Sequence, residues 1–388
     1  MKNILTLNKI AKIGLDVFGE GFTCGDAVTS PAGIMLRSAS MHEMEIPASV
    51  MGIARAGAGV NNIPIDKCSE TGIVVFNTPG ANANAVKEMV LTGLLLSSRK
   101  VVDGINWAKT LADKGGEVPA LVEKGKGSFS GPELMGKTLG VIGLGAIGAL
   151  VANAAVRLHM SVIGYDPYIS VDSAWGLSRA VHRANSLKEL LEACDYVSIH
   201  IPLLENTKGM FNSEAFSQMK KGARLLNFSR GELVDNADLK KAVADGIIDC
   251  YVTDFPDGEL LQTDKVIAIP HLGASTPESE DNCAVMAAKE LKGFLEDGNI
   301  KNSVNFPDCD LGKVIGTRVT VIHKNAPGLL TQISDKFANK GINIENMMNK
   351  SKKDFAYTVL DIIDGNVGDD ILKELEGVEG IVRVRVIR

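Results

Sequence analysis

One histidine lies where it could exchange a proton with a bound molecule. His271 follows Pro270 in the stretch IAIPHLGAST, where an apolar run typical of a strand gives way to small residues. Because proline ends a strand's hydrogen bonding and small residues open a turn, we expect the imidazole at a strand end rather than inside a core. An imidazole titrates near pH ~6.5 and can accept a proton close to neutrality. His271 is therefore predicted to be a proton acceptor.

Two charged residues of the same region complete a candidate catalytic set. Arg230 follows the predicted strand Ala223–Phe228, and Glu259 comes five residues after Asp254, which ends another predicted strand. Ligands of a doubly wound parallel sheet bind outside the carboxyl ends of its strands, so these side chains should converge. A guanidinium can grip a substrate carboxylate, and a glutamate paired with His271 would stabilise the imidazolium and fix its tautomer.

These residue types indicate oxidation of a 2-hydroxy acid, in which a hydride leaves to nicotinamide and the hydroxyl proton leaves to a base. From spacing alone, another interpretation stays open. The arginine and the glutamate would then be solvated loop residues, and the histidine would be structural.

A glycine-rich turn supplies a candidate site for the nicotinamide cofactor. Gly143, Gly145 and Gly148 form the pattern G-x-G-x-x-G between an apolar run and a predicted helix. These glycines permit a tight turn, a close approach of pyrophosphate and close packing of helix on strand. Asp166 ends the next predicted strand 18 residues after Gly148, near the spacing of about 20 that is typical of a ribose-binding carboxylate. No arginine follows Asp166 directly, so we expect NAD rather than NADP; a turn residue is the alternative for Asp166.

The elements that must position these residues fall into three segments with different sequence patterns. Residues 97–282 alternate continuously apolar strands with helices, which indicates a parallel sheet covered on both faces. Residues up to about 95 form a smaller α/β unit. After a predicted linker at 302–316, the order of elements becomes βαββαβ, the ferredoxin-like arrangement.

Composition excludes several classes of function. The 388 residues carry 41 basic and 47 acidic side chains, a net charge of −6, which gives no basic surplus for nucleic acid. The six cysteines form no C-x-x-C pair and no cluster with histidine, so we expect free thiols and no metal site. Residues 138–156 carry no charge, yet their glycines indicate a strand, a turn and a helix rather than a membrane span. With no signal peptide visible, we expect a cytoplasmic protein with no membrane partner.

Six segments of the chain together resemble the D-2-hydroxyacid dehydrogenases. In order, they are RAGAGVNNI, VVFNTPGANANAVKE, GKTLGVIGLGAIG, IPLLENTKGMF, LLNFSRGELVD and PHLGAST. The resemblance implies an α/β protein with a doubly wound parallel-sheet (Rossmann) NAD-binding domain at 97–282. That domain would be inserted in a split, flavodoxin-like substrate domain at 1–96 and 283–312. VIHKNAPGLLTQISDKFANKGINIENM resembles the start of an ACT domain, which is ferredoxin-like and would span 316–388.

The resemblance also assigns roles to individual residues. Arg230, Glu259 and His271 would be catalytic, and Arg55, Asn82 and Arg230 would bind the substrate. The cofactor would contact Thr78, Gly143, Gly145, Ala146, Ile147, Gly148, Asp166, Pro202, Ser229, Asp254 and Gly273. The sequence departs from the family's pattern at Leu260, where proline usually follows the catalytic glutamate, and in the short interval of 12 residues between Glu259 and His271. Glu259 is preferred to Asp257 because it keeps the family's offset from Asp254.

Within the family, the motifs are most similar to the members that oxidise 3-phospho-D-glycerate to 3-phosphooxypyruvate, the first step of serine biosynthesis by the phosphorylated route. The alternatives are another D-2-hydroxyacid dehydrogenase, such as a glycerate or hydroxypyruvate reductase, and a non-catalytic protein that senses NADH. The ACT resemblance implies a serine effector at His323, Asn325 and Asn343, unless the tail serves only for dimerisation. The family resemblance also implies a homodimer or a homotetramer.

Overall fold

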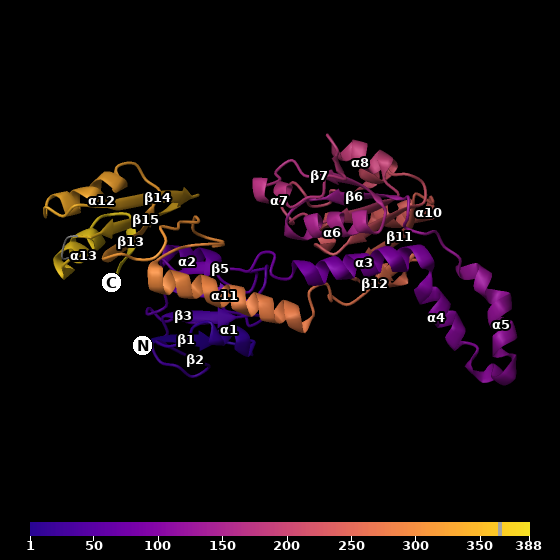
Figure 1. Cartoon of the computed structure of the whole chain (residues 1–388), viewed down its shortest axis with the longest axis horizontal. Coiled ribbons are helices and arrows are strands. Elements are labelled where there is room, and N and C mark those ends of the chain that lie inside the picture. The colour runs from indigo at the N-terminus through magenta and orange to yellow at the C-terminus, as the bar shows by residue number, and fades with distance from the viewer. Residues whose placement is uncertain (364–366) are drawn as a thin grey trace. The chain divides into compact units, whose positions relative to one another are not determined.

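The computed structural model describes residues 1–363 and 367–388 of the chain. They form two compact units, one made of residues 1–82 and 277–388 and the other of residues 83–276. Three sheets organise these units (Figure 1). The expected α/β class with a ferredoxin-like tail is confirmed.

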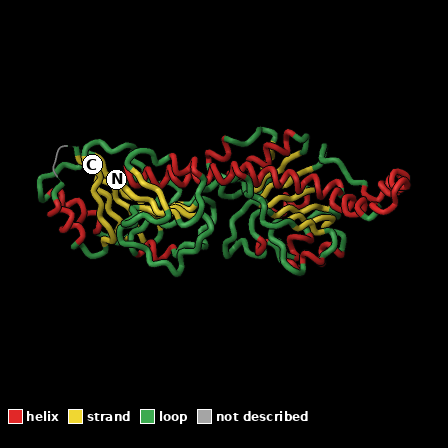
Figure 2. The backbone as a smooth tube through the Cα atoms, turned by 90° about the horizontal axis from the view of Figure 1, so that it is seen from below, coloured by secondary structure: helices red, strands yellow, loops and turns green. Residues whose placement is uncertain are grey.

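The unit of residues 83–276 is built on seven parallel strands in the order β12-β11-β10-β9-β6-β7-β8. Its continuously apolar strands are buried because helices cover both faces (Figure 2). The strands are β6 (Thr138–Ile142), β7 (Ser161–Tyr165), β8 (Val181–Arg183), β9 (Tyr196–Ile199), β10 (Ala223–Asn227), β11 (Ile248–Thr253) and β12 (Val266–Ala268). Chain order reverses between β6 and β9, which places the switch point of the sheet beside the glycine turn.

Helices of this unit begin at side-chain caps where the sequence offers them. Ser170, Ser186, Asn212 and Asp235 accept hydrogen bonds from backbone N–H groups of the first turns that follow. The helices are α3 (Ala83–Arg99), α4 (Val101–Lys109), α5 (Val118–Gly125), α6 (Ala146–Arg157), α7 (Val171–Trp175), α8 (Leu187–Ala193), α9 (Ser213–Ser217) and α10 (Asn236–Ala244). The short 3-10 helices are η1 (Ala112–Glu117), η2 (Lys126–Phe129), η3 (Gly231–Leu233) and η4 (Leu260–Gln262).

The other unit contains a parallel sheet of five strands in the order β2-β1-β3-β4-β5, the flavodoxin-like order. The elements are β1 (Lys2–Thr6), α1 (Lys12–Asp16), β2 (Phe22–Gly25), β3 (Gly33–Leu36), β4 (Gly52–Arg55), α2 (Ile65–Glu70), β5 (Val74–Phe76) and α11 (Pro277–Asp297). One face of the sheet packs against α1 and α11, the long orange helix of Figure 1.

The same unit ends in an antiparallel sheet of four strands in the order β14-β15-β13-β16. Its elements are β13 (Thr317–Lys324), α12 (Leu329–Ala338), β14 (Asn346–Lys352), β15 (Phe355–Ile362), α13 (Asp369–Glu376) and β16 (Ile381–Ile387). One face of the sheet packs under α12 and α13. Ile322, Tyr357 and Val359 on the other face join the apolar cluster that contains Phe294 and Phe306.

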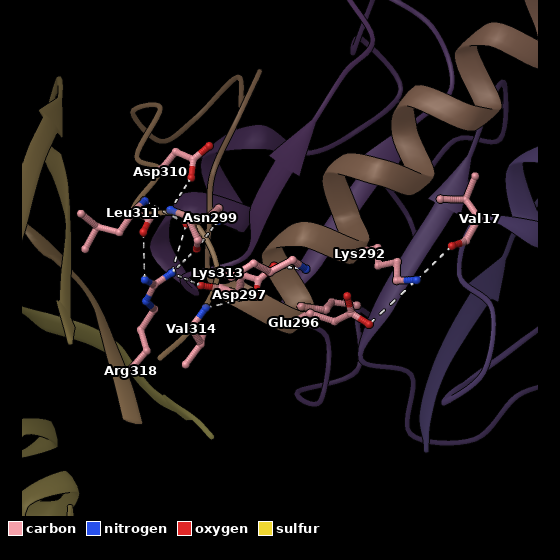
Figure 3. A network of polar contacts seen from close by, with 12 residues as sticks. Val17, Lys292, Glu296, Asp297, Asn299, Asp310, Leu311, Lys313, Val314 and Arg318 are labelled. Carbon is pink, nitrogen blue, oxygen red and sulfur yellow. Dashed lines mark hydrogen bonds and ion pairs between the residues drawn. The ribbon is translucent and has the colours of Figure 1, made fainter. Parts of the chain in front are cut away.

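The chain between α11 and β13 is held by a buried arginine. Arg318 is fully buried and makes an ion pair with Asp361 at 2.6 Å. Its guanidinium also donates to the carbonyl oxygens of Asp297 and Gly312 and to the side chain of Asn299 (Figure 3). The predicted linker is therefore fixed by side-chain contacts at this end.

The predicted domain boundaries fall within helices. The boundary at 96/97 lies in α3, which packs on α6, β10 and β11, and the boundary at 282/283 lies in α11. The three-domain division with these limits stays a prediction. The uncharged stretch 138–156 forms β6, the glycine turn and most of α6. Among the described residues, no helix has the length and apolarity that a membrane span requires.

Candidate active site

The glycine turn after β6 has the backbone geometry that a pyrophosphate site requires. Gly143 has φ +86°, and a Cβ there would lie 2.4 Å from the carbonyl oxygen of His200. A Cβ at Gly148 would lie 1.9 Å from the carbonyl oxygen of Gly143, so only glycine lets α6 approach β6 this closely. A Cβ at Gly145 would meet no described atom within 4 Å. The predicted contacts Ala146 and Ile147 form the first turn of α6, whose free N–H groups favour an anion.

Asp166 fastens the strand end of β7 to the glycine turn. One carboxylate oxygen accepts the N–H of Leu144 at 2.8 Å, and the other accepts the N–H of Tyr168 at 2.8 Å. Each oxygen keeps a further lone pair for a ribose hydroxyl. Asp166 can therefore hold the glycine turn in place and bind a nucleotide at the same time.

The end of β10 holds Arg230 through a buried asparagine. Asn227 is fully buried, and its amide accepts the N–H of Ser229 and donates to the carbonyl oxygen of Arg230. The hydroxyl of Ser229 donates to the carbonyl oxygen of Ile199 at 2.7 Å. Arg230 itself is exposed, with one nitrogen bonded to the carbonyl oxygen of Ser229. This turn leaves the guanidinium available at the carboxyl end of the sheet.

His271 lies beside Asp254 and Phe255. Its exposed ring packs on Phe255 with ring centroids 4.7 Å apart, a contact that sequence reasoning missed. Asp254 is 1% exposed, and one of its oxygens accepts the N–H of Gly273 at 3.0 Å. Burial raises the pKa of the Asp254 carboxyl, while the Gly273 N–H, His271 and Arg230 act in the opposite direction. A Cβ at Gly273 would lie only 2.9 Å from the Asp254 oxygen that accepts this N–H, which explains why a glycine stands two residues after His271.

Glu259 does not pair with His271 in the described part of the chain, so the expected geometry needs correction. Its side chain is 70% exposed and makes an ion pair with Lys240 of α10. The cause is local: an oxygen of Asp257 accepts the N–H groups of Glu259 and Leu260, which winds the chain into η4. Leu260 then takes the buried position, and Glu259 points to solvent. The catalytic role of Glu259 remains a proposal.

The end of β9 brings further predicted contacts to this edge of the sheet. The carbonyl oxygen of Pro202 accepts the hydroxyl of Thr207, which orders the loop. His200 contacts the hydroxyl of Ser198 through Nε2 at 2.8 Å. Burial lowers the pKa of His200 to about 3, so its ring is neutral near pH 7.

The unit of residues 1–82 and 277–388 carries the remaining predicted contacts. Thr78 is fully buried, and its N–H donates to the carbonyl oxygen of Gly57. Arg55 is half-buried at the end of β4 and donates to the carbonyl oxygen of Arg37 at 3.1 Å. Asn82 is half-buried just before α3.

The three predicted effector residues lie in the four-stranded sheet and its loops. His323 is 3% exposed on β13, with Nδ1 on the carbonyl oxygen of Lys324 and Nε2 on the hydroxyl of Thr358. Asn325 is exposed and donates to the carbonyl oxygen of Lys353. Asn343 is exposed in the loop before β14. The structure places His323 inside the sheet, where both ring nitrogens have partners.

One buried polar atom of the seven-stranded unit fits a dinucleotide. Within the described residues, Oδ1 of Asp254 is buried without a hydrogen-bond partner. Buried polar groups are rarely left unsatisfied, so such an atom points to a ligand. Asp254 is a predicted cofactor contact, and with the glycine turn and Asp166 of the same unit it fits NAD. In the other unit, the hydroxyl of the predicted contact Thr78 is also buried without a described partner. The described residues contain no cluster of histidine, cysteine and carboxylates that could hold a metal ion.

Comparison with known proteins identifies relatives of this chain. Residues 94–273 match the family model "D-isomer specific 2-hydroxyacid dehydrogenase, NAD binding domain", and residues 319–383 match "AHAS small subunit-like ACT domain". The D-3-phosphoglycerate dehydrogenase of Haemophilus influenzae is 33% identical over 344 residues, 85% of this chain and 79% of that protein. Its Escherichia coli K12 namesake is 33% identical over 341 residues, with the same shares.

A solved structure is also similar to this chain. The NAD-bound 3-phosphoglycerate dehydrogenase of Entamoeba histolytica superposes with a TM-score of 0.60 at 26% identity, covering 78% of this chain and 98% of that one. The chain therefore belongs to the D-3-phosphoglycerate dehydrogenase family of NAD-dependent, D-isomer specific 2-hydroxyacid dehydrogenases, and it ends in an ACT domain.

Proposed function

We propose that this protein uses NAD to oxidise 3-phospho-D-glycerate to 3-phosphooxypyruvate, the first step of serine biosynthesis by the phosphorylated route. The observation that carries the proposal is the convergence of Arg230, Asp254 and His271 at the carboxyl ends of neighbouring strands. The names of the two relatives that are 33% identical support the choice of substrate.

The chemistry divides between the cofactor and the residues of the chain. NAD, when bound, would supply the acceptor for the hydride from C2 of the substrate. The imidazole of His271 takes the hydroxyl proton, and the neighbouring Asp254 favours the imidazolium that results. Arg230 binds the carboxylate of the substrate through its planar guanidinium. In the reverse direction His271 returns the proton to the carbonyl oxygen.

Other residues are proposed to bind rather than to react. Arg55 and Asn82 would contact anionic groups of the substrate, and Thr78, Pro202, Ser229 and Gly273 would contact the cofactor. Glu259 would assist His271 only after its carboxylate leaves Lys240, because the two groups form an ion pair in this structure.

A substrate panel tests the proposal. NADH formation or consumption is followed with phosphoglycerate and phosphohydroxypyruvate, and separately with glycerate and hydroxypyruvate. We expect kcat/KM to be at least about tenfold higher for the phosphorylated pair. A preference for the unphosphorylated pair would identify a glycerate or hydroxypyruvate reductase, and NADH binding without any turnover would identify a sensor.

The remaining proposals concern regulation, assembly and location. We propose that serine binds near His323, Asn325 and Asn343; unchanged initial rates at millimolar serine, with no heat of binding, would reject this idea.

Homodimers would form through the seven-stranded unit, where Leu95, Val101 and Ile105 are exposed, and tetramers through the tails. None of the six cysteines, all in the described residues, forms a disulfide, which supports a cytoplasmic location.

A further inference from the structure

The segment after α11 is bound into the edge of the five-stranded sheet. Ser303 forms an antiparallel bridge with Phe76, and its hydroxyl donates to the carbonyl oxygen of Val75 at 3.0 Å. The side-chain oxygen of Asn305 accepts the N–H of Val75 at 2.9 Å. Ser303 and Asn305 are both less than 9% exposed. This segment therefore fixes the last strand of the sheet, β5.

The loop that starts at the end of β5 carries two residues proposed to bind ligands. We call residues 77–82 the substrate loop; it includes Thr78 and Asn82. Its first N–H, from Asn77, donates to the carbonyl oxygen of Asn302 at 3.4 Å. The amide of Asn302 in turn donates to Glu290 of α11 at 2.6 Å. The position of the loop thus depends on the segment around Ser303.

A lysine of the ACT domain reaches this segment. Lys352 is the last residue of β14, and its ammonium donates to the carbonyl oxygen of Ser303 at 2.8 Å. Burial lowers the pKa of Lys352, while the carboxylate of Asp308 favours its charged form. The side chain lines an open hollow of about 500 Å³ together with Asn77, Pro79 and Asn302 of the same unit.

The ACT domain has further anchors, so Lys352 is not needed to attach it. Arg318 ties β13 to the segment that follows α11 (Figure 3), and Arg383 donates to the carbonyl oxygen of Val50 at 2.6 Å. Arg385 donates to the carbonyl oxygen of Phe294 at 2.8 Å. Loss of the Lys352 contact should therefore loosen the Ser303 segment, which keeps its contacts with β5, without detaching the domain.

We propose that Lys352 of the ACT domain is a positioning residue for the substrate loop. Its ammonium holds the backbone of Ser303, Ser303 holds Val75, and the loop begins two residues later. The inference rests on the proposed function, since the loop matters to catalysis only if it binds the substrate. It gives the ACT domain a direct mechanical connection to substrate binding within one chain.

The test compares three variants of the full-length protein. Lys352→Met removes the ammonium and keeps the length of the side chain, Lys352→Arg keeps a charged donor, and Lys350→Met is the matched control at an exposed lysine of the same strand. For Lys352→Met we expect KM for phosphoglycerate to rise about three- to tenfold, with kcat within about twofold of wild type. Lys352→Arg should restore most of the loss, and Lys350→Met should behave as wild type.

Hydrogen exchange supplies a readout that does not depend on turnover. In Lys352→Met the amides of residues 74–82 should exchange at least about fivefold faster, while strands of the seven-stranded sheet keep their protection. Equal kinetics and equal exchange in Lys352→Met and Lys350→Met would overturn the proposal. Faster exchange throughout the ACT domain with a lowered Tm would overturn it too, because Lys352 would then serve only stability.

A second substitution tests the middle of the connection. Ser303→Ala removes the hydroxyl bound to Val75 but keeps the carbonyl bound to Lys352. If both groups act through one path, the double variant should raise KM no more than the stronger single variant. Multiplied effects would contradict a shared path. If wild type fails to turn over phosphoglycerate, the proposed function fails, while the exchange experiment still decides the role of Lys352.

Discussion

At the residue scale, the proposed mechanism depends on which carboxylate stabilises the imidazolium form of His271. Asp254 is buried, lies next to His271 and keeps one oxygen without a described partner, whereas Glu259 is exposed and forms an ion pair with Lys240. A carboxylate in low dielectric interacts more strongly with an imidazolium than a solvated one does. We therefore expect Asp254 to stabilise the His271 imidazolium more than Glu259 does, although Glu259 keeps the position that the family pattern assigns to it.

Amide substitutions separate the two carboxylates. Asp254→Asn should lower kcat/KM by about 10² or more, because it removes the buried charge beside His271, while its amide oxygen can still accept the N–H of Gly273. Glu259→Gln should cost about tenfold or less. Steady-state kinetics of both variants at one pH, with Lys240→Met as the control for the ion pair, measure the difference. A larger loss for Glu259→Gln would show that Glu259 leaves Lys240 and acts on His271 during turnover.

At the element scale, sequence patterns predicted most strands and missed the local turns that orient side chains. Continuous apolar runs and the glycine pattern identify the strands, the cofactor turn and Asp166, because burial on both faces and φ > 0 leave clear marks in a sequence. The sequence does not indicate which way the Glu259 side chain points, because this depends on the side chain of Asp257, which caps a single turn. The attachment of residues 302–305 to β5 was also missed, because it rests on single polar contacts.

Helix α11 carries a buried carboxyl that makes stability depend on pH. Burial raises the pKa of Glu290 to about 8, with one oxygen on Asn302 and the other without a described partner. The folded protein thus holds a proton that the unfolded chain releases above its ordinary pKa of ~4.3. The stability due to this group is complete below that value and is lost as pH rises through about 8.

Glu290→Gln should remove this dependence. Urea unfolding at pH 6 and pH 9 should show a clear loss of unfolding free energy in wild type and a smaller loss in the variant, whose neutral amide cannot ionise. At pH 9 the variant should be the more stable protein. Glu296→Gln, at a half-buried position of the same helix, is the matched control. Identical pH profiles for wild type and Glu290→Gln would show that the carboxyl is solvated.

At the scale of the whole molecule, the proposed catalytic residues and the ACT domain belong to different units. The seven-stranded unit holds the glycine turn, Arg230 and His271, whereas the other unit joins the five-stranded sheet and the ACT sheet through a shared apolar cluster. Arg318 lies at that junction, fully buried and hydrogen-bonded to Asp361 and to three backbone carbonyls. A buried charge with this many partners is costly to remove, since the partners stay behind unpaired.

Arg318→Ala should therefore destabilise the protein by about 3–5 kcal/mol. Differential scanning calorimetry of this variant and of Lys313→Ala, which removes an exposed lysine from the same network, measures the contrast. Lys313→Ala should leave Tm nearly unchanged because solvent screens its ion pair with Asp297. Equal shifts in Tm for the two variants would contradict the role of Arg318 at the junction.

The central claim is that His271 accepts the proton of the substrate hydroxyl. Oxidation of 3-phospho-D-glycerate by wild type and by His271→Asn measures this most directly, with NADH binding followed by fluorescence in the same samples. The account predicts that kcat falls by about 10²–10⁴ while the Kd for NADH stays within about twofold. Turnover of His271→Asn within about threefold of wild type, with NADH still bound, would contradict it.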